Sequence, residues 1–488
     1  MSKLFDNLSN LTHTENGAMA FSSSTDPIVD LFTAANSFVS IDDSDVDDLA
    51  GLFTLAWKYD KNLTIRAMLQ AYDCRKGGGR RDAFMVMMET LARLTKDGEG
   101  IQDEQFSMLA LPIQEYGRWD MYWKLIEYLE EKKVSIKAWT FRLLYFIRMG
   151  LNNSNTVSLC AKWMPRKGKM ANRIRGFLSM KPADYRHMLS AHKTTETYMS
   201  ANKWSEIKYE HVPSKCGMRN SSAFTKHDYD RYDQYIDAVN IGKATMHTGV
   251  LYPYEIVANC RALGSDAANV MWKTFIETAD YDRSVNVLPI VDVSGSMARP
   301  IGKTTALHVA MSLGLYLAQT NKGMFANEVV TFSGHPDFVR LDSSDLLKAL
   351  MQMHDLDWGM NTDFNKVFEI MLSRAVRSGI SNDEMPRVIM VFSDMEFDAA
   401  CAGNLTGYEM VKKQYEKAGY TMPLLVFWNI GESHPFPALA SQPGVVEVSG
   451  FSPSIIKPIL ECDFEKINPA KMVRDILMSD RYNIGLNL

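Results

Sequence analysis

Apolar residues recur at steps of three and four positions from about residue 43 to residue 150, a spacing that predicts amphipathic helices. Two clear stripes are Phe84, Met87, Met88, Leu91 and Trp123, Leu125, Ile126, Leu129. Short polar breaks separate the stripes near Lys61 and at residues 75–81, 97–100 and 131–133. Helices joined by short breaks are typical of stacked helical hairpins, so the pattern predicts a helical-repeat domain of the HEAT-like type.

Near Val285 the spacing changes to short, continuous apolar runs, at 287–291, 329–332, 388–392, 424–428 and 445–448. Helical stretches lie between them, at 304–319, 344–353, 365–377 and 408–418. Apolar strands alternating with amphipathic helices predict a parallel sheet covered on both faces. Residues 338–341, which follow a turn with Gly334 and Pro336, are a candidate antiparallel edge strand.

The predicted fold class is therefore α + α/β, a helical-repeat domain followed by a doubly wound, Rossmann-like domain. The expected parts are a flexible N-terminal segment at 1–25, the helical domain at 26–284, the α/β domain at 285–480 and a C-terminal tail at 481–488. The 488 residues are 46% hydrophobic and 23% charged, which is typical of packed globular chains. Six dispersed cysteines, no secretory signal and no long apolar run indicate a reduced, cytoplasmic protein without a membrane partner.

Residues 160–226 form a basic segment, with fourteen Lys or Arg against four acidic residues and a net charge of +10, although the whole chain carries −5. Aromatic residues alternate with these charges, namely Trp163, Tyr185, Tyr198, Trp204 and Tyr209, and this composition suits phosphate contacts and base stacking. An ordinary solvated helical face is the alternative. The candidate RNA contacts are the four cations of the glycine-containing loop at 75–81 and the first six of this segment, namely Arg75, Lys76, Arg80, Arg81, Lys162, Arg166, Lys167, Lys169, Arg173 and Arg175.

Directly after the first predicted strand the chain reads Asp292-Val293-Ser294-Gly295-Ser296. A carboxylate and two hydroxyls at alternate positions of a tight loop present oxygens to one point, which suits a hard divalent cation such as Mg²⁺ or Mn²⁺. Thr362 and Asp394 lie at two later loops of the same predicted sheet. A capped turn without metal is the alternative for the first loop alone.

In this order and at these strand ends, the five residues resemble the metal-ion-dependent adhesion site (MIDAS) of a von Willebrand factor type A domain. The resemblance implies that Ser294 and Ser296 bind Mg²⁺ directly and that Thr362 joins them or acts through water. It also implies that Asp292 and Asp394 act largely through water, which leaves one position open for a carboxylate of a protein ligand.

Longer stretches of the chain resemble a family from plants, giant viruses, bacteria and phages, in which a helical region precedes a von Willebrand type A domain. The stretches are 14–18, 30–32, 75–78, 161–165, 212–214, 357–364 and 392–398. The architecture is also similar to that of the Ro ribonucleoprotein (TROVE) family, which binds small and misfolded RNAs. This second resemblance implies a small or structured RNA as partner.

Three functions remain open at this point. The first is a Ro-like, non-enzymatic scaffold that holds RNA on the helices and recruits a protein through the metal. The second is a protein-only adaptor or assembly factor. The third, a Mg²⁺-dependent hydrolase, is disfavoured because no general base stands at a recognisable spacing. Asp363 and Glu396 lie close to the site in sequence, and their mutation would test this option.

Overall fold

The computed structural model describes residues 10–13, 19–41, 45–192, 194–278, 283, 285–302, 304–331, 336–356, 364–394, 408–431, 445–461, 468–486 and 488. These residues form two compact units, each assembled from separate stretches of the chain. The helical unit comprises Ser40–Val212 and Leu477–Leu488, and the sheet unit comprises Met1–Val39 and Pro213–Ile476. The predicted flexible segment at 1–25 falls partly outside the described residues.

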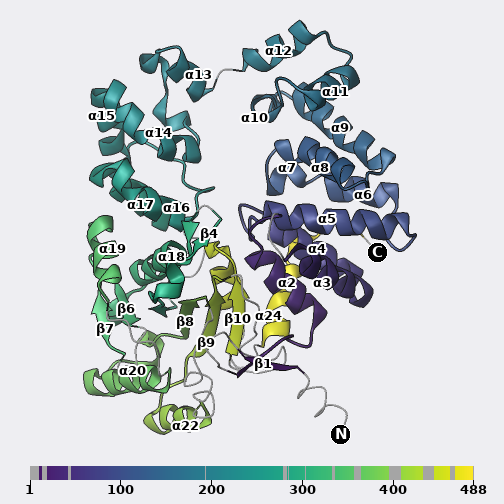
Figure 1. Cartoon of the computed structure of the whole chain (residues 1–488). Coiled ribbons are helices and arrows are strands. Elements are labelled where there is room, and N and C mark those ends of the chain that lie inside the picture. The colour runs from purple at the N-terminus through teal and green to yellow at the C-terminus, as the bar shows by residue number, and fades with distance from the viewer. Residues whose placement is uncertain are drawn as a thin grey trace. The chain divides into compact units, whose positions relative to one another are not determined.

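The helical unit consists of α-helices and short 3-10 turns, as the apolar spacing predicted (Figure 1). Phe84, Met87, Met88 and Leu91 are all buried, so the predicted stripe faces the core. The elements are α3 (Val46–Tyr59), α4 (Lys61–Tyr72), α5 (Arg81–Lys96), α6 (Asp103–Ala110), α7 (Ile113–Tyr116), α8 (Asp120–Glu131), α9 (Lys137–Asn152), α10 (Val157–Trp163), α11 (Lys169–Phe177), α12 (Pro182–Ala191), α13 (Thr195–Ser200), η1 (Trp204–Glu206), η2 (Tyr209–His211) and η8 (Asp480–Tyr482).

The sheet unit is built on six strands in the order β7-β6-β3-β8-β9-β10. All neighbouring pairs are parallel except β6 with β7, so the predicted antiparallel edge strand is confirmed. The described residues of β3 and β8 are fully buried, as expected for strands covered on both faces. The strands are β3 (Val287–Val291), β6 (Glu328–Thr331), β7 (Phe338–Arg340), β8 (Val388–Ser393), β9 (Leu424–Asn429) and β10 (Val445–Ser449).

Helices α18 (Ala306–Thr320), α19 (Leu346–His354), α20 (Phe364–Ser378) and α22 (Tyr408–Ala418) occur where the sequence predicted helices (Figure 1). Helices α23 (Ile456–Leu460) and α24 (Pro469–Leu477), which follow the last strand, were not predicted. Short elements complete this part: β1 (Leu11–His13), β2 (Met19–Phe21), β4 (Pro300–Ile301), β5 (Thr304–Thr305), η3 (Gly295–Ala298), η4 (Gly323–Phe325), η5 (Asn382–Glu384) and η7 (Pro453–Ile455). The chain is thus α + α/β, as predicted.

The division into units differs from the predicted boundary near residue 285. Four helices that precede β3 pack in the sheet unit, namely α14 (Ser214–His227), α15 (Tyr229–Asn240), α16 (Pro253–Leu263) and α17 (Ser265–Glu277). Trp272 of α17 donates a hydrogen bond from Nε1 to Gln319 of α18 at 2.7 Å. Helical spacing reveals which face of a helix is buried but not what covers it, so the sequence assigned these helices to the preceding repeats.

The N-terminal helix α2 (Pro27–Ser37) also belongs to the sheet unit and packs against the edge strand β10. Asp26 caps α2 by accepting from Ile28 N at 2.9 Å. Ser449 of β10 donates from its hydroxyl to the Thr33 carbonyl at 2.8 Å. Residues separated by more than 400 positions therefore close one edge of the sheet, which no local pattern predicts.

Candidate metal site and basic surface

The strand order places two loops of the predicted metal site side by side. From β3 the chain moves to β6 on one side and later returns to β8 on the other, so β3 and β8 flank the point where the strand order reverses. Ligands of doubly wound sheets bind outside the carboxyl ends of the strands at such a reversal. Asp292 directly follows β3 and Asp394 directly follows β8.

Both carboxylate oxygens of Asp292 have defined partners. Oδ1 accepts from the Ser294 backbone N–H at 2.9 Å, and Oδ2 accepts from the Ser393 hydroxyl at 2.7 Å. These two bonds fix the orientation of the carboxylate and draw the loop at 292–294 towards the end of β8. The Ser294 and Ser296 hydroxyl oxygens lie 3.0 Å apart.

Asp292 and Asp394 are only 3% and 7% exposed. Burial raises the pKa of Asp292 above its ordinary value of 3.8, and the neighbouring charge of Asp394 adds to this effect. Hydrogen bonds from Ser294 and Ser393 act in the opposite direction. Two buried carboxylates close together favour an occupant that carries positive charge, either a proton or a metal ion.

The oxygens of this loop fit a small divalent cation. Adjacent ligands of an octahedral Mg²⁺ ion at about 2.1 Å lie about 3.0 Å from each other, which is the spacing of the two serine hydroxyls. Thr362, the remaining predicted ligand, lies outside the described residues. Among the described residues no group of three or more His, Cys, Asp or Glu side chains is arranged for metal binding, so any metal here relies on the hydroxyls.

Two residues at this site escaped the sequence prediction. Ser393, fully buried at the end of β8, contacts Asp292 directly. Gly431 lies beside Asp394, and a Cβ atom at this position would be 2.9 Å from the Asp394 carbonyl oxygen and 3.1 Å from its Cβ. Ser393 immediately precedes the predicted ligand Asp394, which is a signal that sequence reasoning could have used. Gly431 carries no such signal.

Backbone hydrogen bonds tie the basic loop at 75–81 to the end of α4 and to Asp73. The N–H groups of Gly77 and Gly79 donate to the Asp73 carbonyl at 3.1 Å each, and Gly78 N–H donates to the Gln70 carbonyl at 3.0 Å. These amides are therefore not directed at a phosphate. Of the predicted cations, Arg75 and Lys76 are exposed, Arg80 is half-buried, and Arg81 forms an ion pair with Asp82 at 3.2 Å.

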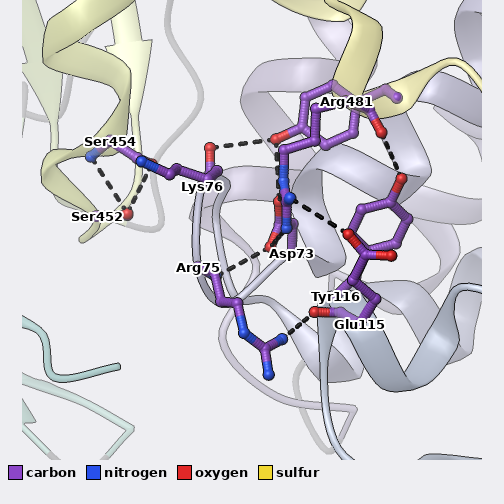
Figure 2. Close-up of polar contacts among 9 residues, drawn as sticks. Asp73, Arg75, Lys76, Glu115, Tyr116, Ser452, Ser454 and Arg481 are labelled. Carbon is purple, nitrogen blue, oxygen red and sulfur yellow. Dashed lines mark hydrogen bonds and ion pairs between the residues drawn. The ribbon is translucent and has the colours of Figure 1, made fainter. Parts of the chain in front are cut away.

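Asp73, which is fully buried, anchors this loop to the C-terminal residues of the same unit (Figure 2). Arg481 contacts the Asp73 carboxylate through Nε and through Nη2, the latter at 2.9 Å. The Tyr116 hydroxyl donates to the Arg481 carbonyl at 2.5 Å, and the guanidinium lies 5.0 Å from the centre of the Tyr116 ring. Residues 481–488, predicted as a tail, thus form part of the helical unit.

Acidic side chains neutralise part of the predicted RNA surface. Lys162 forms an ion pair with Glu196 at 3.1 Å. Arg173 contacts the Glu130 carboxylate, and the Lys169 ammonium lies 3.7 Å from it. Because Lys169 is 87% exposed, its interaction with Glu130 is weak and its charge faces solvent.

The remaining cations of the set have neutral partners or face solvent. Arg166 is exposed and donates to the Ser190 hydroxyl at 3.1 Å. Arg175 is half-buried and donates to the Met180 carbonyl at 3.1 Å. Lys167 is exposed. Among the predicted cations from 162 to 175, the exposed ones are therefore Arg166, Lys167 and Lys169, at or just before the start of α11.

The predicted segment at 160–226 is divided between the two units. Its last three cations, Lys215, Arg219 and Lys226, lie on α14 in the sheet unit, whereas the others precede residue 213. Two of its aromatic residues, Tyr185 and Tyr209, are buried, and Tyr185 donates its hydroxyl to the Pro165 carbonyl at 3.1 Å. These two tyrosines stabilise the fold and present no free face to a base.

A stronger sequence signal begins further upstream. Between Glu131 and Asp184 the chain has no acidic residue, and these 52 positions carry twelve Lys or Arg. The stretch covers α9, α10 and α11, all in the helical unit. The predicted segment began at residue 160 and thereby left out α9.

Comparison with known proteins places these features in context. Residues 286–479 match the model of a family described as a domain of unknown function (DUF7788), and residues 14–93 and 168–287 match a second one (DUF2828). The sequence is 27% identical to the uncharacterized protein L728 of Acanthamoeba polyphaga mimivirus, over 96% of this chain and 88% of that protein.

Among solved structures, the fold is similar to that of the Ro (RSR) protein of Deinococcus radiodurans. The TM-score is 0.50 at 13% sequence identity, with 93% of this chain and 99% of that chain covered. The architecture is Ro-like. At this identity the similarity concerns the fold alone.

In the described part of the chain, no helix combines the length and the apolar character that crossing a bilayer requires.

Proposed function

We propose that this protein is a non-enzymatic scaffold that holds RNA on the basic surface of its helical unit and recruits a protein through a divalent cation at Asp292. The RNA part rests on one observation above all, the stretch of twelve cations without an acidic residue over α9–α11. Such a surface attracts a polyphosphate backbone and releases its counterions. The Ro-like fold supports the proposal by analogy only.

The second part concerns the sheet unit. Asp292, Ser294, Ser296 and Asp394 would hold Mg²⁺ or Mn²⁺ as in a von Willebrand type A domain, with Thr362 as a further ligand. When bound, the ion supplies a Lewis-acidic position for a carboxylate of a protein ligand. The protein's own contribution is the fixed orientation of Asp292 by Ser294 N–H and Ser393 Oγ.

A protein-only adaptor is the second candidate. The ion pairs that some cations of the basic surface form with acidic side chains favour it. Glu130 and Glu196 neutralise part of the basic surface, and two of the aromatic residues expected to stack on bases are buried. In that case the surface would contact an acidic protein.

The test is a salt series of RNA binding by nuclease-treated protein, measured by fluorescence anisotropy. The variant Arg166→Glu/Lys167→Glu/Lys169→Glu leaves Arg173 in place, because Arg173 contacts Glu130. The matched control is Lys412→Glu/Lys413→Glu/Lys417→Glu on α22, which makes the same charge change at exposed positions of the sheet unit.

We expect the wild type and the α22 control to bind with a steep salt dependence. The first variant should bind more weakly, and its slope in a plot of log K against log salt should fall by about 0.7 for each phosphate that is no longer neutralised. If all forms fail to bind RNA at low salt, the RNA proposal is wrong and the adaptor remains. Equal weakening in both variants would show binding driven only by net charge.

A further inference from the structure

Helix α9 exposes large apolar side chains in a row. Phe141, Tyr145 and Met149 are 56%, 41% and 46% exposed and follow one another at four-residue steps, so they lie on one face of the helix. The opposite face is buried through Trp139, Leu143 and Ile147. α9 therefore packs into the core through one face and presents a second apolar face to solvent.

The row is surrounded by positive charge. α9 carries Lys137, Arg142 and Arg148 and has no acidic residue, and neither α10 nor α11 has one. Lys137 and Arg148 are exposed, and Arg142 is half-exposed. Phe141 is held from one side by Phe177 of α11, with ring centres 5.5 Å apart in an edge-to-face arrangement.

Exposed aromatic rings beside the cations of α9 suit a partner that has both flat rings and negative charge. An apolar peptide gains from the rings but not from the cations, whereas unpaired nucleotides gain from both. Phe141 and Tyr145 are separated by about 6 Å along the helix axis, compared with about 3.4 Å between stacked bases of one strand. The spacing therefore suits unstacked bases of a single strand. In a duplex the base faces are stacked on one another and are not accessible to the rings.

We propose that α9 is a stacking platform for unpaired nucleotides, in which Phe141 and Tyr145 each take one base and Arg142 and Arg148 contact the adjoining phosphates. This inference rests on the proposed RNA function and specifies its ligand as a single-stranded segment. It assigns the base contacts to a helix upstream of the cations tested above.

The test compares a labelled 20-nucleotide single-stranded RNA with a blunt RNA duplex of the same length, using the full chain. Phe141→Ala/Tyr145→Ala removes both rings, and Phe141→Tyr/Tyr145→Phe keeps them. The matched control is Leu55→Ala/Tyr59→Ala on α3, which removes one aliphatic and one aromatic side chain, 58% and 59% exposed, from the same unit. Circular dichroism melts check that each variant is folded.

We expect the double alanine variant to bind single strands at least tenfold more weakly, with an unchanged salt slope and unchanged duplex affinity. The ring-keeping variant and the α3 control should bind like the wild type. Photocrosslinking with 5-iodouridine RNA should modify tryptic peptides 138–142 and 143–148, which contain Phe141 and Tyr145.

Distinct outcomes separate this inference from the proposed function. If RNA binds and the cation variant weakens it, but the double alanine variant binds normally, α9 is not the platform although the RNA function stands. If the double alanine variant instead abolishes a concentration-dependent dimer in sedimentation velocity and leaves RNA affinity intact, the row is a self-association face. If no form binds RNA, the proposed function itself fails.

Discussion

Asp292 illustrates how one side chain can organise a loop before any ligand arrives. Its two oxygens accept from Ser294 N–H and Ser393 Oγ, and the serine hydroxyls of the loop are left 3.0 Å apart. Asp292, Ser294 and Ser296 could be predicted together as candidate ligands because they lie within five consecutive positions. The Ser393 contact joins residues 101 positions apart, and only the pairing of β3 with β8 brings it about.

Removal of the Asp292 charge tests the metal site directly. Asp292→Asn keeps the size of the side chain, and we expect it to weaken Mn²⁺ binding at least tenfold, because a carboxylate that supports the ion and its waters is lost. Mn²⁺ binding is measured by electron paramagnetic resonance. Asp383→Asn, at an exposed position of the same unit, is the control. Equal Mn²⁺ affinity in both variants would contradict the site.

Glu447 supports a separate prediction, about pH. It is 4% exposed on β10, and burial raises its pKa well above 4.5, with Asp30 of α2 adding to the rise and Asn429 opposing it. The folded state thus holds a proton that the unfolded chain releases above about pH 4.5. Stability from this group is fully present below that pH and is lost as the pH rises towards the folded pKa.

Glu447→Gln is neutral at every pH, so we expect it to raise the free energy of unfolding near pH 7 by about 1–3 kcal/mol. In thermal melts from pH 5 to pH 8, its advantage over the wild type should grow with pH. Glu416→Gln, at an exposed position of α22, should show no such trend. An advantage of Glu447→Gln that is constant over this range would mean that Glu447 does not titrate as stated.

At the scale of elements, the local pattern predicted well what local residues determine. Every predicted strand and helix of the sheet appears, because runs such as Val388–Phe392 are apolar without interruption and are bounded by polar turns. The covering of β10 by α2 was not predictable, since an amphipathic helix does not specify its partner. Tyr185 and Tyr209 were misjudged because tyrosine suits a buried site as well as an exposed one.

The contact of Arg481 with Asp73 yields an element-scale prediction. Arg481→Ala leaves a fully buried carboxylate without its guanidinium, and the loss of one partner of a buried pair costs about 3–5 kcal/mol. We expect faster hydrogen exchange at residues 77–80, whose N–H groups donate to the carbonyls of Gln70, Ala71 and Asp73. Mass spectrometry of peptides covering 70–81 measures it. The control is Lys471→Ala, which removes the solvent-exposed ion pair of Lys471 with Asp475. Equal exchange in the two variants would show that Arg481 does not anchor the loop.

At the scale of the molecule, each unit is assembled from separate stretches of the chain, and this limits which fragments can fold alone. A fragment of residues 285–480 would lack α2, which covers β10, and α16 and α17, which pack on α18 and α19. We expect this fragment to aggregate or to melt well below the whole chain, because newly exposed apolar surface destabilises it. A fragment as stable as the whole chain in thermal melts would show that these helices contribute little.

The same division predicts that the two proposed ligands bind independently. The candidate RNA contacts lie in the helical unit, and the described metal-site residues lie in the sheet unit, so the two sites share no residue. We expect saturating Mn²⁺ to change the RNA dissociation constant by less than about twofold, and RNA to change the Mn²⁺ constant by the same factor, since coupling is reciprocal. RNA titrations with and without Mn²⁺ measure this coupling. The Asp292→Asn variant is the control for Mn²⁺ that acts on the RNA itself, because this variant should bind the ion at the metal site much more weakly. A larger effect that vanishes in Asp292→Asn would reveal a metal-controlled change in the helical unit, and the protein would then act as a switch whose metal site regulates its RNA surface.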